Sequence, residues 1–138
     1  MTTYLDTSVV VSLFAADVHS PAAERLVASA SGVIVSDLTA TEFASALAIQ
    51  HRSGSRSRAE VRSAFATFDD WCDVHAHTED VISADLRSAD AAIRTLDIPL
   101  KAADTIHIMV AIRLGATLAT FDAAMACEAD RLGVLIAT

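Results

Sequence analysis

Short apolar segments alternate with helical segments from one end of this chain to the other. The apolar runs are Thr3–Ser8, Val33–Val35, Asp73–His77, Ala116–Thr120 and Val134–Ile136, of which the third is the weakest. No two of them are joined by the short turn that marks a β-hairpin. Strands buried on both faces read as continuous apolar runs, which is typical of a parallel sheet covered by helices. The pattern therefore predicts a three-layer α/β/α sandwich around a parallel sheet of about five short strands.

Seven helical segments separate these strands. We expect them at Val9–Phe14, Ala22–Ala30, Leu38–His51, Arg58–Trp71, Glu79–Leu96, Pro99–Leu114 and Phe121–Leu132. Thr7 or Ser8 could cap the first helix, and Pro21 suits the first turn of the second. Gly115 and Gly133 are stop signals after the last two helices.

The composition predicts one domain, residues 1–138. With 138 residues and 53% hydrophobic content, the chain can bury about two-thirds of its unfolded surface. Cys72 and Cys127 lie far apart and lack metal-ligand spacing, so we expect two buried, reduced thiols. No signal-peptide pattern begins the chain, and no apolar run reaches the roughly 18 residues of a membrane span. We expect a soluble cytoplasmic protein without membrane contact.

Two acids follow the ends of predicted strands. Asp6 ends the first apolar run and is followed by two hydroxyl residues, whereas Asp122 lies two residues past Thr120. In open parallel sheets, ligands bind beyond the carboxyl ends of the strands, so both acids lie where chemistry is expected. The alternatives are a turn or cap residue for Asp6 and a first-turn helix acid for Asp122.

Two further acids interrupt helices that are otherwise apolar. Asp104 lies in a helix of mostly Ile, Val, Met and Leu, where a buried carboxylate is costly unless a cation accompanies it. The alternative is that Asp104 lies in the first turn of its helix, where its negative charge interacts favourably with the helix dipole. Glu42 is the sole acid of its helix, and its alternative is a capping box with Thr39. We interpret His107 as a core histidine with hydrogen-bond partners rather than as a metal ligand.

All four acids could converge at one rim of the sheet. Three or four carboxylates with little else form a hard-oxygen site, which suits Mg²⁺ or Mn²⁺ better than zinc or copper. Asp73, His75 and His77 would share one face of a strand and could hold a transition metal, but a solvated edge strand explains them more simply.

The net charge of −8 argues against broad electrostatic attraction to nucleic acid. The cations are nevertheless concentrated between the third and fourth predicted helices, at Arg52, Arg56, Arg58 and Arg62. These arginines are candidate phosphate contacts, and a solvated loop or a partner-facing patch explains them equally well.

Five short motifs together resemble one family. They are Tyr4-Leu5-Asp6-Thr7-Ser8, Thr41-Glu42-Phe43, Ala103-Asp104-Thr105-Ile106-His107, Leu118-Ala119-Thr120-Phe121-Asp122 and Arg131-Leu132-Gly133-Val134. In this order and in a chain of this length, they resemble the PIN-domain ribonucleases, specifically the VapC-type toxins of bacterial and archaeal toxin–antitoxin pairs. One mild departure is Thr105, where the family usually has a small apolar residue.

The resemblance implies a site, an activity and partners. The site is an acidic quartet of Asp6, Glu42, Asp104 and Asp122 around Mg²⁺ or Mn²⁺, with Ser8 and Thr120 as supporting hydroxyls. The implied activity is metal-dependent endoribonuclease cleavage, and the implied strand order is 3-2-1-4-5. A homodimer and a cognate antitoxin are the implied partners, besides the RNA substrate. The competing hypothesis is a PIN-like module that binds protein or RNA without catalysis. An aspartyl-phosphate hydrolase would need an acid at position 8, where Ser8 stands.

Overall fold

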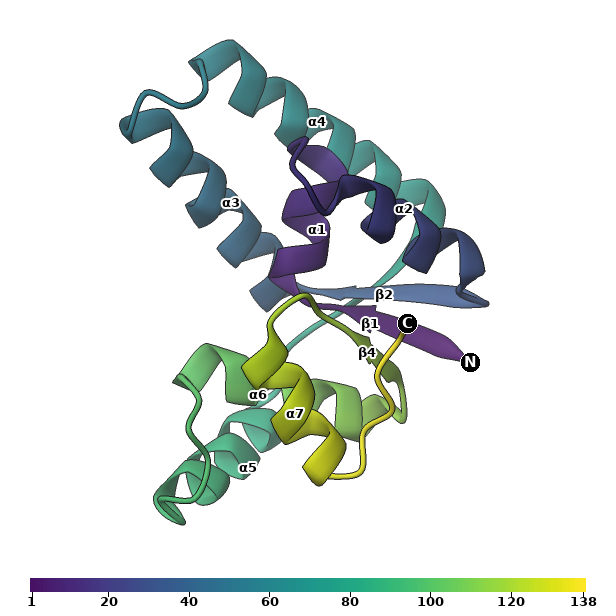
Figure 1. Ribbon diagram of the computed structural model, residues 1–138, viewed down its shortest axis with the longest axis vertical. Helices are drawn as coiled ribbons and strands as arrows, with labels where there is room; N and C mark the ends of the chain where they lie inside the picture. Colours follow the sequence, from purple (N-terminus) through teal and green to yellow (C-terminus); the bar gives the residue numbers. More distant parts are fainter.

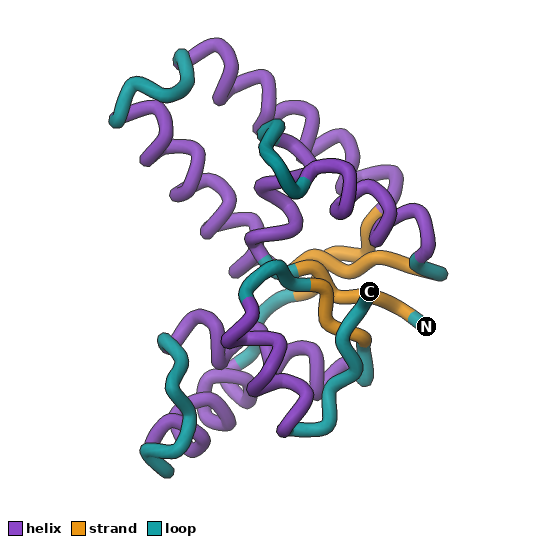
Figure 2. The backbone as a smooth tube through the Cα atoms, in the orientation of Figure 1, coloured by secondary structure: helices purple, strands orange, loops and turns teal.

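A four-stranded parallel sheet forms the middle layer of the computed structural model, which describes residues 1–138 (Figures 1 and 2). The strands are β1 (Thr2–Leu5), β2 (Gly32–Ser36), β3 (Ala76–Glu79) and β4 (Thr117–Ala119). They lie in the order β3-β2-β1-β4, and Tyr4 of β1 pairs with Ile34 on one side and Leu118 on the other. The predicted order is confirmed, including the adjacency of the first and fourth strands.

The fifth predicted strand is reduced to a single bridge between Leu118 and Ile136. The Leu118 amide donates to the Leu135 carbonyl at 2.8 Å, and the Ala137 amide donates to the Leu118 carbonyl at 2.8 Å. The segment therefore follows β4 at the outer edge of the sheet, where the predicted order puts it, but it is too short to count as a strand.

Seven helices cover the two faces of the sheet. They are α1 (Thr7–Phe14), α2 (Ser20–Ser29), α3 (Asp37–Arg52), α4 (Arg58–His75), α5 (Ser83–Arg94), α6 (Ala102–Leu114) and α7 (Ala123–Arg131). Figure 1 shows α1 to α4 on one side of the sheet and α5 to α7 on the other. This arrangement is the predicted α/β/α sandwich.

Each face of the sheet has its own hydrophobic core. On one face Leu5 and Val35 pack with residues of α1, α3 and α4, including Phe43. On the other face Tyr4 and Ile34 pack with residues of α6 and α7. Because successive strand residues point to opposite faces, burial on both sides explains why the strands read as unbroken apolar runs.

Some predicted boundaries are wrong. Helix α4 continues to His75, so the expected strand face of Asp73, His75 and His77 does not exist. The helix persists because Phe68 and Cys72, one turn apart, both remain buried in the core.

Three other expectations also fail at the level of single residues. Helix α6 begins at Ala102 rather than at Pro99, and Asp6 caps α1 rather than Thr7 or Ser8. Both cysteines are free thiols, but only Cys72 is buried, whereas Cys127 is exposed. No helix is long and apolar enough to cross a membrane.

Candidate active site

The four predicted acids line one cavity of about 110 Å³ at the carboxyl ends of β1 and β4. Its walls are formed by Asp6, Thr7, Ser8, Glu42, Asp104, His107, Asp122 and Met125. The two strand ends are joined where the Asp6 amide donates to the Ala119 carbonyl at 3.1 Å. Helices α3 and α6 bring in Glu42 and Asp104 from the two opposite layers. Segments far apart in the chain thus meet at one edge of the sheet.

Asp6 is buried, with 2% of its surface exposed, and no cationic side chain pairs with it. Its carboxylate accepts hydrogen bonds from Ser8 Oγ at 2.6 Å, Thr120 Oγ1 at 2.5 Å and the Val9 amide at 3.2 Å. Burial raises the pKa of Asp6 although these donors oppose the shift. The predicted supporting hydroxyls, Ser8 and Thr120, therefore both contact this acid.

Asp104 and Asp122 lie at the starts of two helices. Asp104 is half-buried in the first turn of α6, and Asp122 caps α7 by accepting a hydrogen bond from the Met125 amide at 3.0 Å. Burial raises the pKa of Asp104, and the charges of Asp122 and Glu42 raise it further. Asp104 thus occupies the first-turn position of its alternative, whereas Asp122 is the cap of its helix rather than a first-turn acid, and both acids also line the cavity.

Glu42 is held by partners that the sequence did not predict. Thr7 Oγ1 donates to its Oε1 at 2.8 Å, and His107 Nε2 lies 2.5 Å from the same oxygen. The bond to His107 is the main cause that lowers the pKa of Glu42, against the effect of burial. The expected capping box with Thr39 is wrong, because Ser36 caps α3 and the Thr39 amide donates to Ser36 Oγ at 3.1 Å.

His107 is a core histidine with both ring nitrogens paired, as predicted. Only 1% of its surface is exposed, and Nδ1 lies 2.6 Å from the Tyr4 hydroxyl. Its Nε2 contacts Glu42, one of the cavity acids, and residue spacing alone did not reveal this contact. Tyr4, Thr7 and Met125 were not predicted at this site, since a tyrosine in a strand, a threonine after an acid and a methionine in a helix carry no specific signal.

The side chains around the cavity fit a hard divalent cation by their chemistry. Apart from the soft thioether sulfur of Met125, their available ligand atoms are oxygens, because the imidazole of His107 is already occupied by Glu42 and Tyr4. The repulsion that raises the pKa of Asp104 is what a cation would relieve. As the side chains stand, however, no three acidic, histidine or cysteine residues are close enough to form a ready-made metal site. Asp6 and Glu42 instead direct oxygens at their hydroxyl and imidazole partners.

The four candidate arginines do not reach this cavity. Arg52, Arg56, Arg58 and Arg62 surround the loop between α3 and α4, at the far end of α3 from Glu42 (Figure 1). Ten helical residues separate Glu42 from Arg52, which corresponds to about 15 Å. Arg56 donates to Gln50 Oε1 at 2.5 Å and to the Ala16 carbonyl at 3.1 Å, so it also ties this loop to the end of α1.

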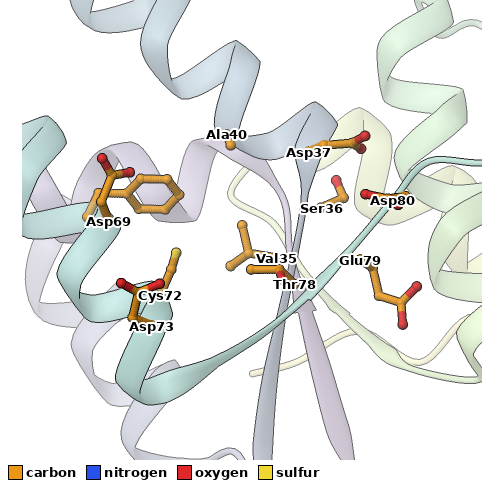
Figure 3. A pocket seen from close by; sticks show the side chains of 11 residues that line it. Val35, Ser36, Asp37, Ala40, Asp69, Cys72, Asp73, Thr78, Glu79 and Asp80 are labelled. Atoms are coloured by element: carbon orange, nitrogen blue, oxygen red, sulfur yellow. The ribbon is translucent and has the colours of Figure 1, made fainter.

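A larger pocket of about 340 Å³ lies over β2 and β3, between the start of α3 and the end of α4 (Figure 3). Its apolar residues are Val35, Ala40, Phe68 and Cys72, and its acids are Asp37, Asp69, Asp73, Glu79 and Asp80. Figure 3 shows these carboxylates spread around the pocket, and Asp37 accepts a hydrogen bond from the Val81 amide at 2.9 Å. None of them follows β1 or β4, where the hydroxyl-bonded acids meet. The smaller cavity is therefore the candidate active site.

Solved structures with the same fold include bacterial toxins. The chain is similar to VapC20 from Mycobacterium tuberculosis, a sarcin-ricin loop cleaving toxin, with a TM-score of 0.72 and 21% identity over 91% of this chain and 94% of that chain. It is also similar to VapBC2 from Rickettsia felis, solved bound to a DNA fragment from their promoter, with a TM-score of 0.68 and 18% identity over 99% and 96% of the two chains. For FitAcB from Neisseria gonorrhoeae the TM-score is 0.60, again with 18% identity over 99% and 96%.

The sequence itself matches a family model. Comparison with curated proteins gives no match. The model of the PIN domain, by contrast, matches residues 3–131, which include all four acids of the cavity and every strand but the first residue of β1. Together with the sheet order and the position of the cavity, this match identifies the chain as a member of the PIN-domain family.

Proposed function

We propose that this protein is a Mg²⁺- or Mn²⁺-dependent endoribonuclease and the toxin of a VapC-type toxin–antitoxin pair. The observation that carries the proposal is the set of four acids lining one cavity at the carboxyl ends of β1 and β4. The similar structure from Mycobacterium tuberculosis is a toxin that cleaves the sarcin-ricin loop, which supports RNA as the class of substrate.

Asp6, Glu42, Asp104 and Asp122 would hold the cation. A bound divalent cation supplies the Lewis acidity that activates water for in-line attack on a phosphodiester and offsets the charge that develops there. Ser8 and Thr120 keep the Asp6 carboxylate oriented by donating to its two oxygens. The Asp122 amide in turn donates to Thr120 Oγ1 at 3.0 Å, so two of the acids are linked through one hydroxyl.

The expected products are 3′-hydroxyl and 5′-phosphate ends, because water is the nucleophile and the ribose 2′-hydroxyl takes no part. The test is to incubate the pure protein with total cellular RNA, with and without Mg²⁺, and to map the cut ends. Cleavage should stop with EDTA. Cyclic-phosphate ends or EDTA-resistant cleavage would contradict the proposal and indicate a contaminating ribonuclease.

The second candidate function is a PIN-like module that binds RNA or protein without catalysis. The observation that favours it is that no three acidic, histidine or cysteine residues are grouped as a ready-made metal site. The same experiment separates the two candidates, since the module would retain RNA without producing new ends at any Mn²⁺ concentration.

A cognate antitoxin and a second copy of the chain are the proposed protein partners. A groove of about 540 Å³ between α1 and α4, which includes Leu13, Phe14 and Ala64, is the surface we assign to the antitoxin. Exposed Ile82 and Leu86 of the α5 region adjoin an apolar groove near the cavity and form the face we assign to the homodimer. Sedimentation of wild type and Leu86→Glu tests the dimer, which the added charge should dissociate.

A further inference from the structure

We infer that His107 and Tyr4 are positioning residues that fix the Glu42 carboxylate for the cation, an inference that rests on the proposed function. The three side chains come from α6, β1 and α3, which belong to different layers of the sandwich. They form one continuous hydrogen-bonded row that ends in the candidate active site.

Tyr4 and His107 are almost completely shielded from water, whereas the Glu42 side chain at the end of the row is 32% exposed. Tyr4 has no exposed surface and His107 has 1%, and their polar atoms meet at 2.6 Å. The Tyr4 hydroxyl also lies 2.7 Å from Ser36 Oγ. Ser36 in turn lines the larger pocket of Figure 3. No buried side-chain nitrogen or oxygen lacks a hydrogen-bond partner, so the row is fully satisfied. Buried polar rows of this kind order their members when every group is paired.

The protons of the row all point toward Glu42. A carboxylate can only accept, so His107 Nε2 carries the proton that faces Glu42. In the neutral imidazole Nδ1 is then an acceptor, and the Tyr4 hydroxyl donates to it. The Tyr4 oxygen accepts from the Ser36 hydroxyl, whose own oxygen accepts from the Thr39 amide at 3.1 Å. The hydroxyl of Thr39 donates to the Leu5 carbonyl at 3.0 Å, so toward Ser36 Oγ, 3.2 Å away, and the Tyr4 hydroxyl, 3.4 Å away, it can only accept.

The result is a glutamate held by one oxygen. Thr7 and His107 both donate to Oε1, and no hydrogen bond is made by Oε2. A long side chain that would otherwise sample several rotamers therefore presents one oxygen in a fixed direction. Partners that hold a metal ligand in this way commonly contribute ten- to a hundredfold to metal affinity, as a rough figure.

Helix α6 consequently contributes two residues to the site. Asp104 and His107 are three residues apart on one face of this helix, so one supplies an acid and the other orients an acid of α3. A buried histidine with a purely structural role would require no particular partner for Nε2. Its pairing with a cavity acid is the feature that distinguishes positioning from packing.

The experiment measures Mn²⁺ binding by titration calorimetry on folded protein, together with kcat and KM for RNA cleavage. We expect His107→Leu to weaken Mn²⁺ binding about tenfold or more. Tyr4→Phe, which removes only the hydroxyl, should weaken it by a smaller factor. His107→Gln keeps an N–H donor near the position of Nε2 and should restore most of the affinity. In each weakened variant kcat should fall while KM for RNA stays the same.

Ile108→Val is the matched control, because Ile108 is fully buried on the same helix and is not one of the residues that line the cavity. It should lower the melting temperature and leave Mn²⁺ affinity unchanged. Wild-type affinity in folded His107→Leu, or an equal loss in Ile108→Val, would overturn the inference. If His107→Leu does not fold, wild-type affinity in Tyr4→Phe overturns it instead.

Glu42→Gln separates the failure of this inference from failure of the proposed function. If Glu42→Gln loses Mn²⁺ binding and cleavage while His107→Leu keeps both, only the positioning roles are wrong. If the wild-type protein itself binds no Mn²⁺ and cuts no RNA, the proposed function is wrong and the inference is overturned with it.

Discussion

Asp6 and Asp85 are equally buried acids in opposite electrostatic surroundings. Each has 2% of its surface exposed. Asp85 receives two hydrogen bonds from the Arg113 guanidinium, at 2.8 and 3.0 Å, and its carboxylate also accepts one from the Ile82 amide at 3.0 Å. Burial works to raise the pKa of Asp85, but these donors outweigh it and the pKa is lowered. Asp6 has only hydroxyls and an amide around it, and its pKa is raised.

The difference separates an acid that has its own cation from an acid that has none, and the proposed function assigns the second to the divalent cation. Arg113 also donates to the Asp80 carbonyl at 3.0 Å, so the Asp85 pair fastens α5 and α6 to the segment after β3. A buried carboxylate that has its own cation needs no further partner. One that lacks a cation is stabilised only when a cation arrives from outside, and this is the property that a metal site requires.

The largest expected effect is on catalysis at the unpaired acids. Asp104→Asn should lower RNA cleavage at least a hundredfold, a loss of roughly 2.7 kcal/mol of transition-state stabilisation, because it removes a charge that holds the cation. The fold should be as stable as wild type, since the substitution relieves repulsion from Asp122 and Glu42. Cleavage rates and denaturant midpoints, measured on the same preparation, check the predicted loss of activity and the predicted unchanged stability. Full activity in Asp104→Asn would remove this acid from the proposed mechanism.

Replacement of Asp85, the acid paired with Arg113, should lower stability and leave cleavage unchanged. Asp85→Asn should lower the free energy of unfolding by about 2 kcal/mol near neutral pH, because Arg113 loses its carboxylate. Cleavage per folded molecule should not change, since no cavity residue contacts Asp85. Because the pKa of Asp85 is lowered in the folded protein, its contribution is present above its unfolded pKa of about 3.9 and is lost as the pH falls below it.

Denaturant titrations of wild type and Asp85→Asn at neutral pH and near pH 3 measure this dependence. The difference in the free energy of unfolding between the two proteins should be largest at neutral pH and should vanish in acid. Asp6→Asn is the matched comparison, because the raised pKa of Asp6 means that its charge costs stability without a cation. A loss of stability in Asp6→Asn as large as that in Asp85→Asn would break the distinction between the two acids.

Added Mn²⁺ should stabilise the protein through the unpaired acids alone. At ten times the dissociation constant, binding to the folded state contributes about 1.4 kcal/mol. Melting curves with increasing Mn²⁺ should therefore shift upward in wild type and in Asp85→Asn. The shift should be absent in Asp6→Asn. An equal shift in all three proteins would mean that Mn²⁺ binds elsewhere.

The smallest effect, on RNA or antitoxin binding, is expected from arginines remote from Asp6 and Asp85. Arg58 and Arg62 are exposed on the outer part of α4, so the double change to Ala should weaken RNA or antitoxin binding without loss of stability. The salt dependence of RNA binding should fall by a slope of about 1 for each phosphate that the arginines no longer bind. Arg87→Ala with Arg94→Ala removes the same charge from α5 and is the control. Arg56 is left intact, because it fastens the loop to Gln50 and Ala16.

The layers could be predicted because strands buried on both faces are continuously apolar in the sequence, whereas the strand order was implied only by the family resemblance. Continuous apolar runs mark β1, β2 and β4, and that pattern becomes faint at β3, where only Ala76 and Glu79 are even partly buried. The end of α4 was missed for the same reason, since its last turn is exposed and resembles an edge strand. The fifth strand is a single bridge, a distinction that depends on tertiary pairing rather than on local residue preference.

The meeting of the four acids and the hydroxyl partners of Asp6 could be predicted, but the partners of Glu42 could not. An acid that interrupts an apolar helix or ends a strand is conspicuous in a sequence. The bonds from His107 and Thr7 to Glu42 depend on how α6 and α1 are rotated against α3, and residue spacing within one segment does not contain that information. The metal and the RNA therefore remain predictions, tested by the experiments above.

The hydrogen bonds around the cavity join parts of the chain that are synthesised far apart in time. Thr120 reaches Asp6 across 114 positions, and His107 reaches Tyr4 across 103. Pairings of such long range form slowly, after the local helices. A nascent chain that stops before Asp122 contains at most three of the four acids, even though its first helices can already fold. The order of synthesis thus delays completion of the cavity until the sheet has gained β4, which leaves the early fragments on the ribosome without an assembled site.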